Sequence, residues 1–513
     1  MKKISLFFSL CSLFFFLLTP GFQAQAQKEQ AKQKETQHNL PSYLDNSTTT
    51  GSISTKNGKI SYKAVAGTMP LWDTRKEQDT TARMSYVAYF KGDGNDSSRP
   101  ITFFYNGGPG SSTLWLHLGS FGPKRVVTDG VNHMGGAPYK LADNPYTILD
   151  ISDVVFIDMP GTGFGRIAKG KEADYHSVDK DAEAFGNFIK NFITQYNRWN
   201  SPKFLYGESY GTLRSALLAS VLQQQHSIDL NGVILLSQIL DYGNSVDRAK
   251  RHPGLNNPYV LALPTYAATA WYHNKLANKP ADLESFLKEV ENFAITDYNL
   301  ALAQGNQLDD ATFNQVANKL HEYTGIAVDY IKKANLRMEG GEFRQQLLAD
   351  QGKIPGRLGT DYSGPIMDPL AQSAWGDPQS DAIGSAYVSL LNDYMRKELK
   401  FGGTTNYKVS LYGEMHWKSE HQGSPGTVSV INDLANALKK NPKLQVMLMG
   451  GYYDLATPYF EGKYELAQLP ISKEQFKNNI HFHFYESGHM IYLNEGVLEE
   501  AHKDLVDFIN KNK

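Results

Sequence analysis

The sequence predicts an α/β fold with a mostly parallel sheet of about eight strands and a helical cap inserted between two of them. Two observations lead to this prediction. Short, almost continuously apolar segments alternate with longer helical segments, as is typical of strands buried on both faces of a parallel sheet. One long interval in the second half of the chain breaks this alternation and is mainly helical.

The first two strands are predicted at 59–65 and 84–90, where apolar and polar residues partly alternate. This pattern is typical of an antiparallel pair with one exposed face. The buried strands are predicted at 101–105, 153–158, 203–206, 232–236, 444–449 and 480–485. Helices are predicted between them, among others at 179–196 and 213–225.

The interval from 243 to 402 lacks further strand signals. Helices are predicted there at 264–276, 281–293, 310–323 and 385–399. We interpret the interval as a helical cap that covers a site on a core made of residues 51–242 and 403–513. A separately packed domain with no role at that site is the alternative.

The first 26 residues are typical of a secretory signal peptide. Two lysines precede an apolar run from Ile4 to Leu18, and a small-residue exit follows at 24–26. The run is shorter than the roughly 20 residues that a membrane span needs, and a retained anchor helix is the alternative. Residues 27–50 are polar and are predicted to form a flexible tether.

The only cysteine, Cys11, lies inside this predicted leader. Cleavage after Ala26 would therefore leave an exported chain without cysteine, which can form no disulfide and no thiolate metal cluster. An exported protein without disulfides suits a bacterial envelope, so we expect a periplasmic or secreted location and no membrane span after signal cleavage.

Charge and composition exclude several kinds of partner. The chain has 51 Lys and Arg against 53 Asp and Glu, and this balance gives no electrostatic reason to expect nucleic acid or an anionic membrane as partner. Histidine pairs lack a third ligand at a suitable spacing, so no metal or other cofactor is predicted. The oligomeric state has no signal in the sequence.

A nucleophile is predicted at Ser209. The segment 207–211 reads Gly-Glu-Ser-Tyr-Gly and lies between a predicted strand and a predicted helix, as the nucleophile-elbow motif requires. The glycines have a physical role, because side chains two residues before and after the serine would collide with neighbouring backbone in so tight a turn.

A serine hydroxyl needs a base and a carboxylate behind that base. In α/β-hydrolases these follow the serine in the order Asp or Glu and then His. Asp454 and His489 each lie in a loop just after one of the last two predicted strands, at the same sheet edge as Ser209. We therefore expect these three residues to form a catalytic triad.

A glycine-rich loop at 106–112 (Asn-Gly-Gly-Pro-Gly-Ser-Ser) follows an earlier strand. Its backbone could approach the nucleophile and donate an N–H group to the oxyanion of a tetrahedral intermediate. The N–H of Tyr210, directly after the nucleophile, is the expected second donor.

Four segments of the chain resemble the serine carboxypeptidase family, peptidase family S10: 106–112, 155–164 (Val-Phe-Ile-Asp-Met-Pro-Gly-Thr-Gly-Phe), 207–211 and 488–490 (Gly-His-Met). The resemblance implies the α/β-hydrolase fold with a helical insertion, and a peptide as substrate. It also implies the triad Ser209, Asp454 and His489, with the N–H groups of Gly108 and Tyr210 as the oxyanion hole.

The resemblance further implies that Asn106 and Glu208, with the Gly107 backbone nearby, bind the C-terminal carboxylate of the substrate. A carboxyl group can donate a hydrogen bond to another carboxylate only while protonated, which favours acidic pH. A structural hydrogen bond under the elbow is the alternative role of Glu208. The chain departs from the family pattern at Ser120, where a second glutamate is common, and also at Ser111 and at the aromatic pair 104–105.

Three hypotheses follow for the function. The first is an exported serine-type carboxypeptidase that works through an acyl-enzyme. The second is an esterase or acyltransferase on the same scaffold, suggested by Ser120. The third is a non-catalytic peptide-binding protein, against which the complete Ser-Asp-His set argues.

Overall fold

A computed structural model describes residues 44–56, 58–72, 80–247 and 249–513. The predicted signal peptide and most of the predicted tether lie outside these residues. Strand β1 (Ser47–Thr55) begins inside the segment predicted as a tether, so that prediction was wrong from Ser47 onward. The strand is rich in Ser and Thr and is held by backbone pairing with β2, so its composition does not reveal it.

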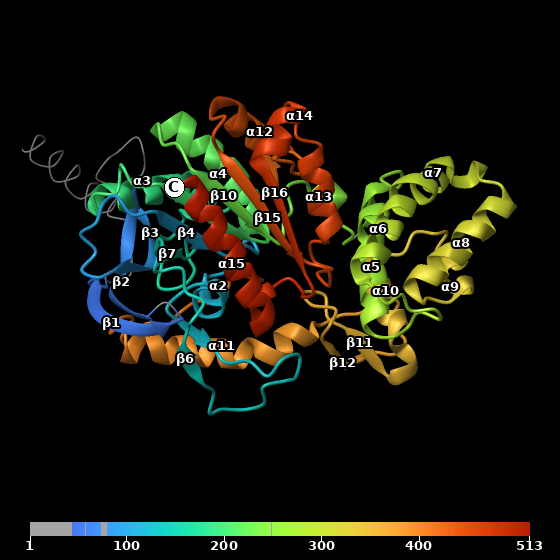
Figure 1. The fold of residues 1–513 in the computed structure, drawn as a ribbon, viewed down its shortest axis with the longest axis horizontal. Coiled ribbons are helices and arrows are strands. Elements are labelled where there is room, and N and C mark those ends of the chain that lie inside the picture. Colours follow the sequence, from blue (N-terminus) through green and yellow to red (C-terminus); the bar gives the residue numbers. More distant parts are fainter. Residues whose placement is uncertain (1–43, 57, 73–79, 248) are drawn as a thin grey trace, which may run out of the picture.

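The centre of the molecule is a ten-stranded sheet (Figure 1). Nine strands run in the order β1-β2-β3-β7-β4-β9-β10-β15-β16, and β8 (Arg166–Ile167) pairs with β3. After β1 come β2 (Gly58–Trp72), β3 (Thr80–Lys91), β7 (Asp153–Ile157), β4 (Ile101–Tyr105), β9 (Lys203–Glu208), β10 (Gly232–Leu236), β15 (Gln445–Gly451) and β16 (Ile480–Tyr485). Along this order, each pair of neighbouring strands from β7 through β4, β9, β10 and β15 to β16 is parallel.

All eight predicted strands are present in this sheet, and the α/β-hydrolase fold is confirmed. The prediction that the first antiparallel pair exposes one face was wrong for β3, which is buried on both sides. Tyr86 of β3 packs into the hydrophobic core on one face of the sheet and Tyr89 into the core on the other. The Tyr89 hydroxyl is hydrogen-bonded to His117 and Tyr394, so the polar end of this buried ring is satisfied.

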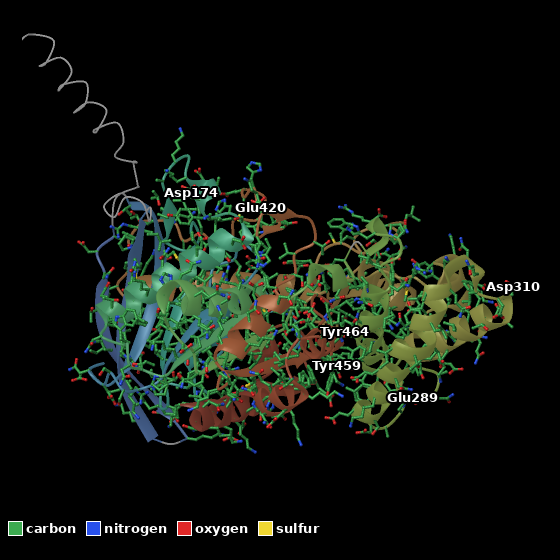
Figure 2. All side chains as sticks on the ribbon, turned by 90° about the horizontal axis from the view of Figure 1, so that it is seen from above. Asp174, Glu289, Asp310, Glu420, Tyr459 and Tyr464 are labelled. Carbon is green, nitrogen blue, oxygen red and sulfur yellow. The ribbon has the colours of Figure 1, made fainter. Side chains whose placement is uncertain are left out.

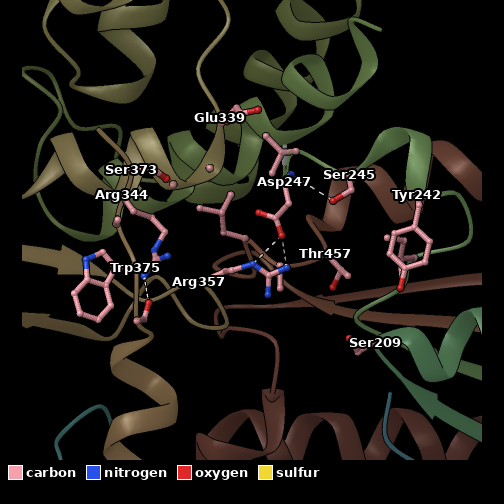
Figure 3. Close-up of a pocket in the computed structure, with 18 of the residues that line it drawn as sticks. Ser209, Tyr242, Ser245, Asp247, Glu339, Arg344, Arg357, Ser373, Trp375 and Thr457 are labelled. Atoms are coloured by element: carbon pink, nitrogen blue, oxygen red, sulfur yellow. Dashed lines mark hydrogen bonds and ion pairs between the residues drawn. The ribbon is translucent and has the colours of Figure 1, made fainter. Parts of the chain in front are cut away.

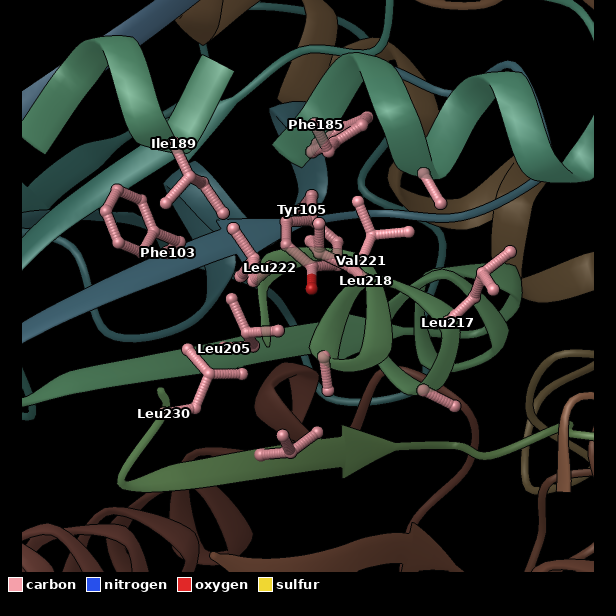
Figure 4. Close-up of a cluster of buried hydrophobic side chains, with 14 of the residues drawn as sticks. Phe103, Tyr105, Phe185, Ile189, Leu205, Leu217, Leu218, Val221, Leu222 and Leu230 are labelled. Carbon is pink, nitrogen blue, oxygen red and sulfur yellow. The ribbon is translucent and has the colours of Figure 1, made fainter. Parts of the chain in front are cut away.

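Helices cover both faces of the sheet. On one face lie α3 (Val178–Gln195), α4 (Tyr210–His226) and α12 (Ile431–Lys440), and on the other lie α2 (Leu114–Gly119), α11 (Pro378–Lys397) and α15 (Glu495–Asn512). Figure 4 shows part of the first core, where Leu218 of α4 packs near Tyr105 of β4 and Phe185 of α3. The nucleophile helix α4 is thus anchored along its length in the core.

The cap lies beside the sheet (Figure 1) and has its own hydrophobic core. Its helices are α5 (Asn257–Tyr272), α6 (Leu283–Phe293), α7 (Asn299–Gln304), α8 (Asp310–Thr324), α9 (Val328–Lys333) and α10 (Gly340–Leu347). Short strand pairs lie at β5 (Lys124–Val126) with β6 (Leu141–Asp143), β11 (Lys353–Pro355) with β12 (Ser363–Pro365), and β13 (Glu420–His421) with β14 (Ser424–Pro425).

Helix α13 (Tyr459–Ala467) joins the cap to the sheet core, and α14 (Lys473–Asn479) follows it. Tyr459 and Tyr464 of α13 lie between the two parts (Figure 2). The Tyr459 hydroxyl donates a 3.0 Å hydrogen bond to Glu291 Oε1 of α6, and Lys463 forms a 2.6 Å ion pair with the same carboxylate. The cap is therefore fixed to the core by packing and by polar contacts.

Helix α11 does not belong with the cap, although it falls inside the predicted insertion 243–402. Figure 1 shows α11 running below the sheet. Its buried side chains, including Tyr387, Leu391 and Tyr394, pack into the core on that face. The chain has therefore already returned from the cap before α11 begins. Helical periodicity in the sequence marks an apolar face but does not say which neighbour that face packs against.

No helix among the described residues is long and apolar enough to cross a membrane.

Replacing Leu218 by Ala tests the packing of the nucleophile helix. The side chain is fully buried, so we expect the free energy of unfolding to fall by about 2–5 kcal/mol, measured by urea denaturation. Gln225→Ala on the exposed face of α4 is the matched control and should change the stability little. Equal effects of the two substitutions would contradict this packing.

Candidate active site

Ser209 occupies a strained turn between β9 and α4. Its φ of 61° and ψ of −132° lie outside the regions that residues with a side chain normally adopt. A Cβ on Gly207 would lie 2.2 Å from the carbonyl oxygen of Gly211, and a Cβ on Gly211 would lie 2.9 Å from that of Tyr105. Both glycines are therefore required by the close packing of backbone around the serine, as the sequence predicted.

A buried ion pair holds the helix behind this turn. Arg214 Nε of α4 donates a 2.6 Å hydrogen bond to Asp181 Oδ2 of α3, and both side chains are fully buried. Arg214 Nη1 also donates to the carbonyl oxygen of Asn106 at 2.8 Å. One guanidinium therefore ties α3, α4 and the glycine-rich loop together.

His489 and Asp454 form the second part of the site. His489 Nδ1 lies 2.8 Å from Asp454 Oδ2, and both residues are at most 3 % exposed. Asp454 Oδ1 accepts hydrogen bonds from the N–H groups of Ala456 at 2.9 Å and Thr457 at 3.0 Å, and Asp454 Oδ2 accepts from the Thr457 hydroxyl at 2.7 Å. The carboxylate is thus held in one orientation toward the imidazole.

This pairing changes the basicity of the imidazole. Burial lowers the pKa of His489, but the negative charge of Asp454 and its hydrogen bond outweigh burial, so the pKa lies above its ordinary value. An imidazole with a raised pKa is a stronger base when it is neutral.

The end of β10 brings Ser209 and His489 to the same edge of the sheet. The N–H of Ser209 donates a 3.0 Å hydrogen bond to the carbonyl oxygen of Leu236, the last residue of β10. The hydroxyl of Ser237, the next residue, donates a 2.8 Å hydrogen bond to the carbonyl oxygen of His489. Both residues are described by the structure, and no hydrogen bond joins Ser209 Oγ to the His489 imidazole. Such contacts are often long before substrate binds.

The glycine-rich loop lies directly against the elbow. A Cβ on Gly107 would lie 2.5 Å from the backbone nitrogen of Tyr210 and 2.8 Å from the carbonyl oxygen of Glu208. Gly108, with φ of +107°, lines the same cavity as Ser209. The loop backbone and the Tyr210 amide, from which we expect the oxyanion hole, are therefore close to one another.

Asn106 and Glu208 meet below this loop. Asn106 Nδ2 donates a 2.9 Å hydrogen bond to Glu208 Oε1, while Asn106 Oδ1 accepts one from the N–H of Leu116 at 3.1 Å. Burial raises the pKa of Glu208 to about 7. The two side chains are only 3 % and 2 % exposed. Glu208 Oε2 makes no regular hydrogen bond to any residue that the structure describes, although the Tyr492 hydroxyl lies near the carboxyl group. Ser120 is also buried and its hydroxyl donates to the carbonyl oxygen of Leu116.

A cavity of about 710 Å³ opens above Ser209, between the elbow and the cap. Figure 3 shows the residues on its wall that sequence reasoning missed, chiefly Tyr242, Asp247, Arg344, Arg357 and Trp375. Tyr242 follows β10 and the others lie within the interval 243–402, and none carries a motif or spacing by which it could have been found.

Comparison with known families gives one family over most of the chain. A sequence model of the family described as serine carboxypeptidase matches residues 57–491, which include the elbow, the glycine-rich loop, Asp454 and His489. The chain belongs to the serine carboxypeptidase family.

Individual relatives share only part of their sequence with this chain, at moderate identity. The chain is 29% identical over 214 residues to the lysosomal protective protein of Mus musculus, a match covering 39% of this chain and 42% of that protein. It is 32% identical over 160 residues to the pheromone-processing carboxypeptidase KEX1 of Saccharomyces cerevisiae, covering 28% of this chain and 20% of that protein. The chain thus matches less than half the length of these relatives.

A solved structure of this Saccharomyces cerevisiae enzyme, a prohormone-processing carboxypeptidase, shares the fold. It aligns with a TM-score of 0.52 and 15% sequence identity, covering 88% of this chain and 91% of the other. At this identity the likeness shows the common fold of the family alone.

Replacing Gly107 by Ala tests the contact between the glycine-rich loop and the elbow. The added Cβ must displace the Tyr210 amide, so we expect kcat on an ester or peptide substrate to fall by about 10²-fold or more, the size of losing one oxyanion donor. Gly384→Ala in α11, where an added Cβ meets nothing within 4 Å, is the matched control. Unchanged kcat in the Gly107 variant would contradict the role of this contact.

Proposed function

We propose that this chain is an exported serine-type carboxypeptidase that removes C-terminal residues from peptides through a Ser-His-Asp triad and an acyl-enzyme. The observation that supports it best is the buried His489–Asp454 pair at the same sheet edge as the strained Ser209. Membership of the family agrees with this proposal.

In the proposed reaction, Ser209 Oγ attacks the carbonyl carbon of the last peptide bond while His489 Nε2 takes the hydroxyl proton. The N–H groups of Gly108 and Tyr210 stabilise the oxyanion of the tetrahedral intermediate. His489 then gives its proton to the leaving amine, which departs as the free C-terminal residue. Water, deprotonated by His489, hydrolyses the acyl-enzyme and restores Ser209. Asp454 keeps Nδ1 protonated and stabilises the imidazolium.

The C-terminal carboxylate is assigned to Asn106, the Gly107 backbone and Glu208. Below about pH 7 the buried Glu208 is neutral and can donate a hydrogen bond to a carboxylate, whereas above that pH it is charged and repels one.

An esterase or acyltransferase on the same scaffold is the second candidate. The observation that favours it is the covered Asn106–Glu208 pair together with Ser120, which replaces a common acidic residue of the carboxylate site by a hydroxyl engaged with backbone. Release of a free C-terminal amino acid from a peptide supports the carboxypeptidase, and acyl transfer to an added alcohol in water supports the transferase.

Export rests on the N-terminal sequence. Residues 1–26 have the basic start, the apolar run and the small-residue exit of a signal peptide. We propose that the mature protein starts after Ala26 and acts in the periplasm or the medium of a bacterial cell.

Replacing Asp454 by Asn tests the triad. The amide can still pair with the imidazole but stabilises the wrong tautomer, so we expect kcat to fall by about 10³- to 10⁴-fold, the scale known for such triads. Asp433→Asn, in α12 and paired with His421 outside the active site, is the control and should leave kcat unchanged. A loss of less than tenfold in the Asp454 variant would contradict the proposed triad.

The pH dependence tests the role of Glu208. For the native enzyme we expect the ratio of kcat/KM for a free peptide acid to that for its C-terminal amide to fall as pH rises through about 7, because Glu208 loses its proton there. Glu208→Gln, which stays neutral, should give a ratio that no longer changes across this range. The same pH dependence in both proteins would show that Glu208 does not read the carboxylate.

A further inference from the structure

The cap side of the cavity holds a buried cation without an ion-pair partner. Arg344 in α10 is only 3 % exposed, yet its side chain lines the cavity above Ser209 (Figure 3). Among the residues that the structure describes, no carboxylate lies within ion-pair distance of its guanidinium. A guanidinium stays charged at every physiological pH, and burying an unpaired charge is costly.

The backbone holds this guanidinium in one orientation. Arg344 Nε donates to the carbonyl oxygen of Pro355 at 2.9 Å, and Nη2 donates to that of Gly376 at 2.7 Å. Nη1 has no hydrogen bond to any described residue. A fixed guanidinium with free N–H groups is suited to a bidentate contact with a carboxylate, because little side-chain entropy remains to be lost.

The other charges on the cavity wall are already engaged. Arg357 Nε donates a 3.0 Å hydrogen bond to Asp247 Oδ2, so these two charges neutralise one another. Glu339 accepts a 2.8 Å hydrogen bond from the N–H of Lys250 and caps α10. Asp377, whose negative charge also acts on Arg344, accepts hydrogen bonds from the N–H groups of 357 and 358. Of the two arginines on the described wall, Arg344 is therefore the one without an ion-pair partner.

We propose that Arg344 is a specificity-determining residue that binds a carboxylate of the peptide substrate. This inference rests on the proposed function, because it takes the cavity above Ser209 to be the substrate site. The carboxylate belongs either to an acidic side chain next to the scissile bond or to the C-terminus itself, which Arg344 would then bind in place of the Asn106–Glu208 pair. In both cases a carboxylate forms an ion pair with the buried guanidinium, and this attraction offsets the cost of having buried its charge.

Four peptides with the same blocked penultimate residue separate the two sources. They end in Glu or Gln, each as the free acid and as the C-terminal amide, and a neutral ester without a carboxylate reports basal catalysis. For Arg344→Gln we expect kcat/KM to fall by about 10- to 100-fold on carboxylate-bearing peptides while ester hydrolysis is kept. A loss confined to Glu peptides assigns the side chain, and a loss confined to free acids assigns the C-terminus.

Arg337→Gln is the matched control. Arg337 is another arginine of the cap that donates to backbone carbonyls, here those of Leu302 at 2.8 Å and Asn335 at 3.2 Å, but it does not line the cavity. An equal loss on all substrates, the ester included, or the same selective loss in the Arg337 variant, would overturn the proposal.

A measurement on the native enzyme keeps the test valid if Arg344→Gln does not fold. N-acetylglutamate should inhibit ester hydrolysis at least tenfold more strongly than the neutral N-acetylglutaminamide, and added salt should weaken this inhibition. Equal inhibition by the two compounds would overturn the proposal. If the enzyme hydrolyses the ester but no peptide, the carboxypeptidase function fails while this inhibition still tests the Arg344 site.

Discussion

The site depends on one close contact between two pieces of backbone, the glycine-rich loop after β4 and the elbow after β9. No side chain fits between Gly107 and the Tyr210 amide, nor between Gly207 and the turn of α4. β4 and β9 are neighbours in the sheet, so their register determines where the two loops meet. The buried Arg214, bound to Asp181 and to the Asn106 carbonyl oxygen, holds that meeting point from behind. The strained φ of Ser209 persists because its surroundings leave no alternative.

The residues around the cavity come from two parts of the molecule, the strand ends of the core and the inserted cap. Asp454 and His489, the proposed triad partners of Ser209, are held by backbone N–H groups and by the residue that follows β10. The cap, which has its own core and meets the sheet through α13, contributes Arg344 and Arg357 to the cavity wall. With the proposed triad on strand ends and part of the cavity wall on an inserted cap, substrate preference can change without altering the triad.

The sequence predicted the parts whose chemistry is local. The six apolar strands, the two alternating strands and the elbow glycines follow from spacing and residue type within a few positions. Ser209, Asp454 and His489 were each found from the strand directly before them. β1 was missed because Ser and Thr pair through backbone without an apolar pattern. α11 was assigned to the cap because a helical pattern in the sequence shows that one face is apolar but not what that face packs against. Arg344 and Arg357 had no local signal, since their meaning comes from a cavity formed by segments far apart in the chain.

The central claim is that Ser209 is the one serine made nucleophilic by the His489–Asp454 pair. Labelling the folded protein with an organophosphonate, followed by peptide mass spectrometry, tests it most directly. We expect a single adduct on Ser209, formed far more slowly when His489 is replaced by Ala and absent when Ser209 is replaced by Ala. An adduct on another serine, or no adduct on folded protein, would contradict it.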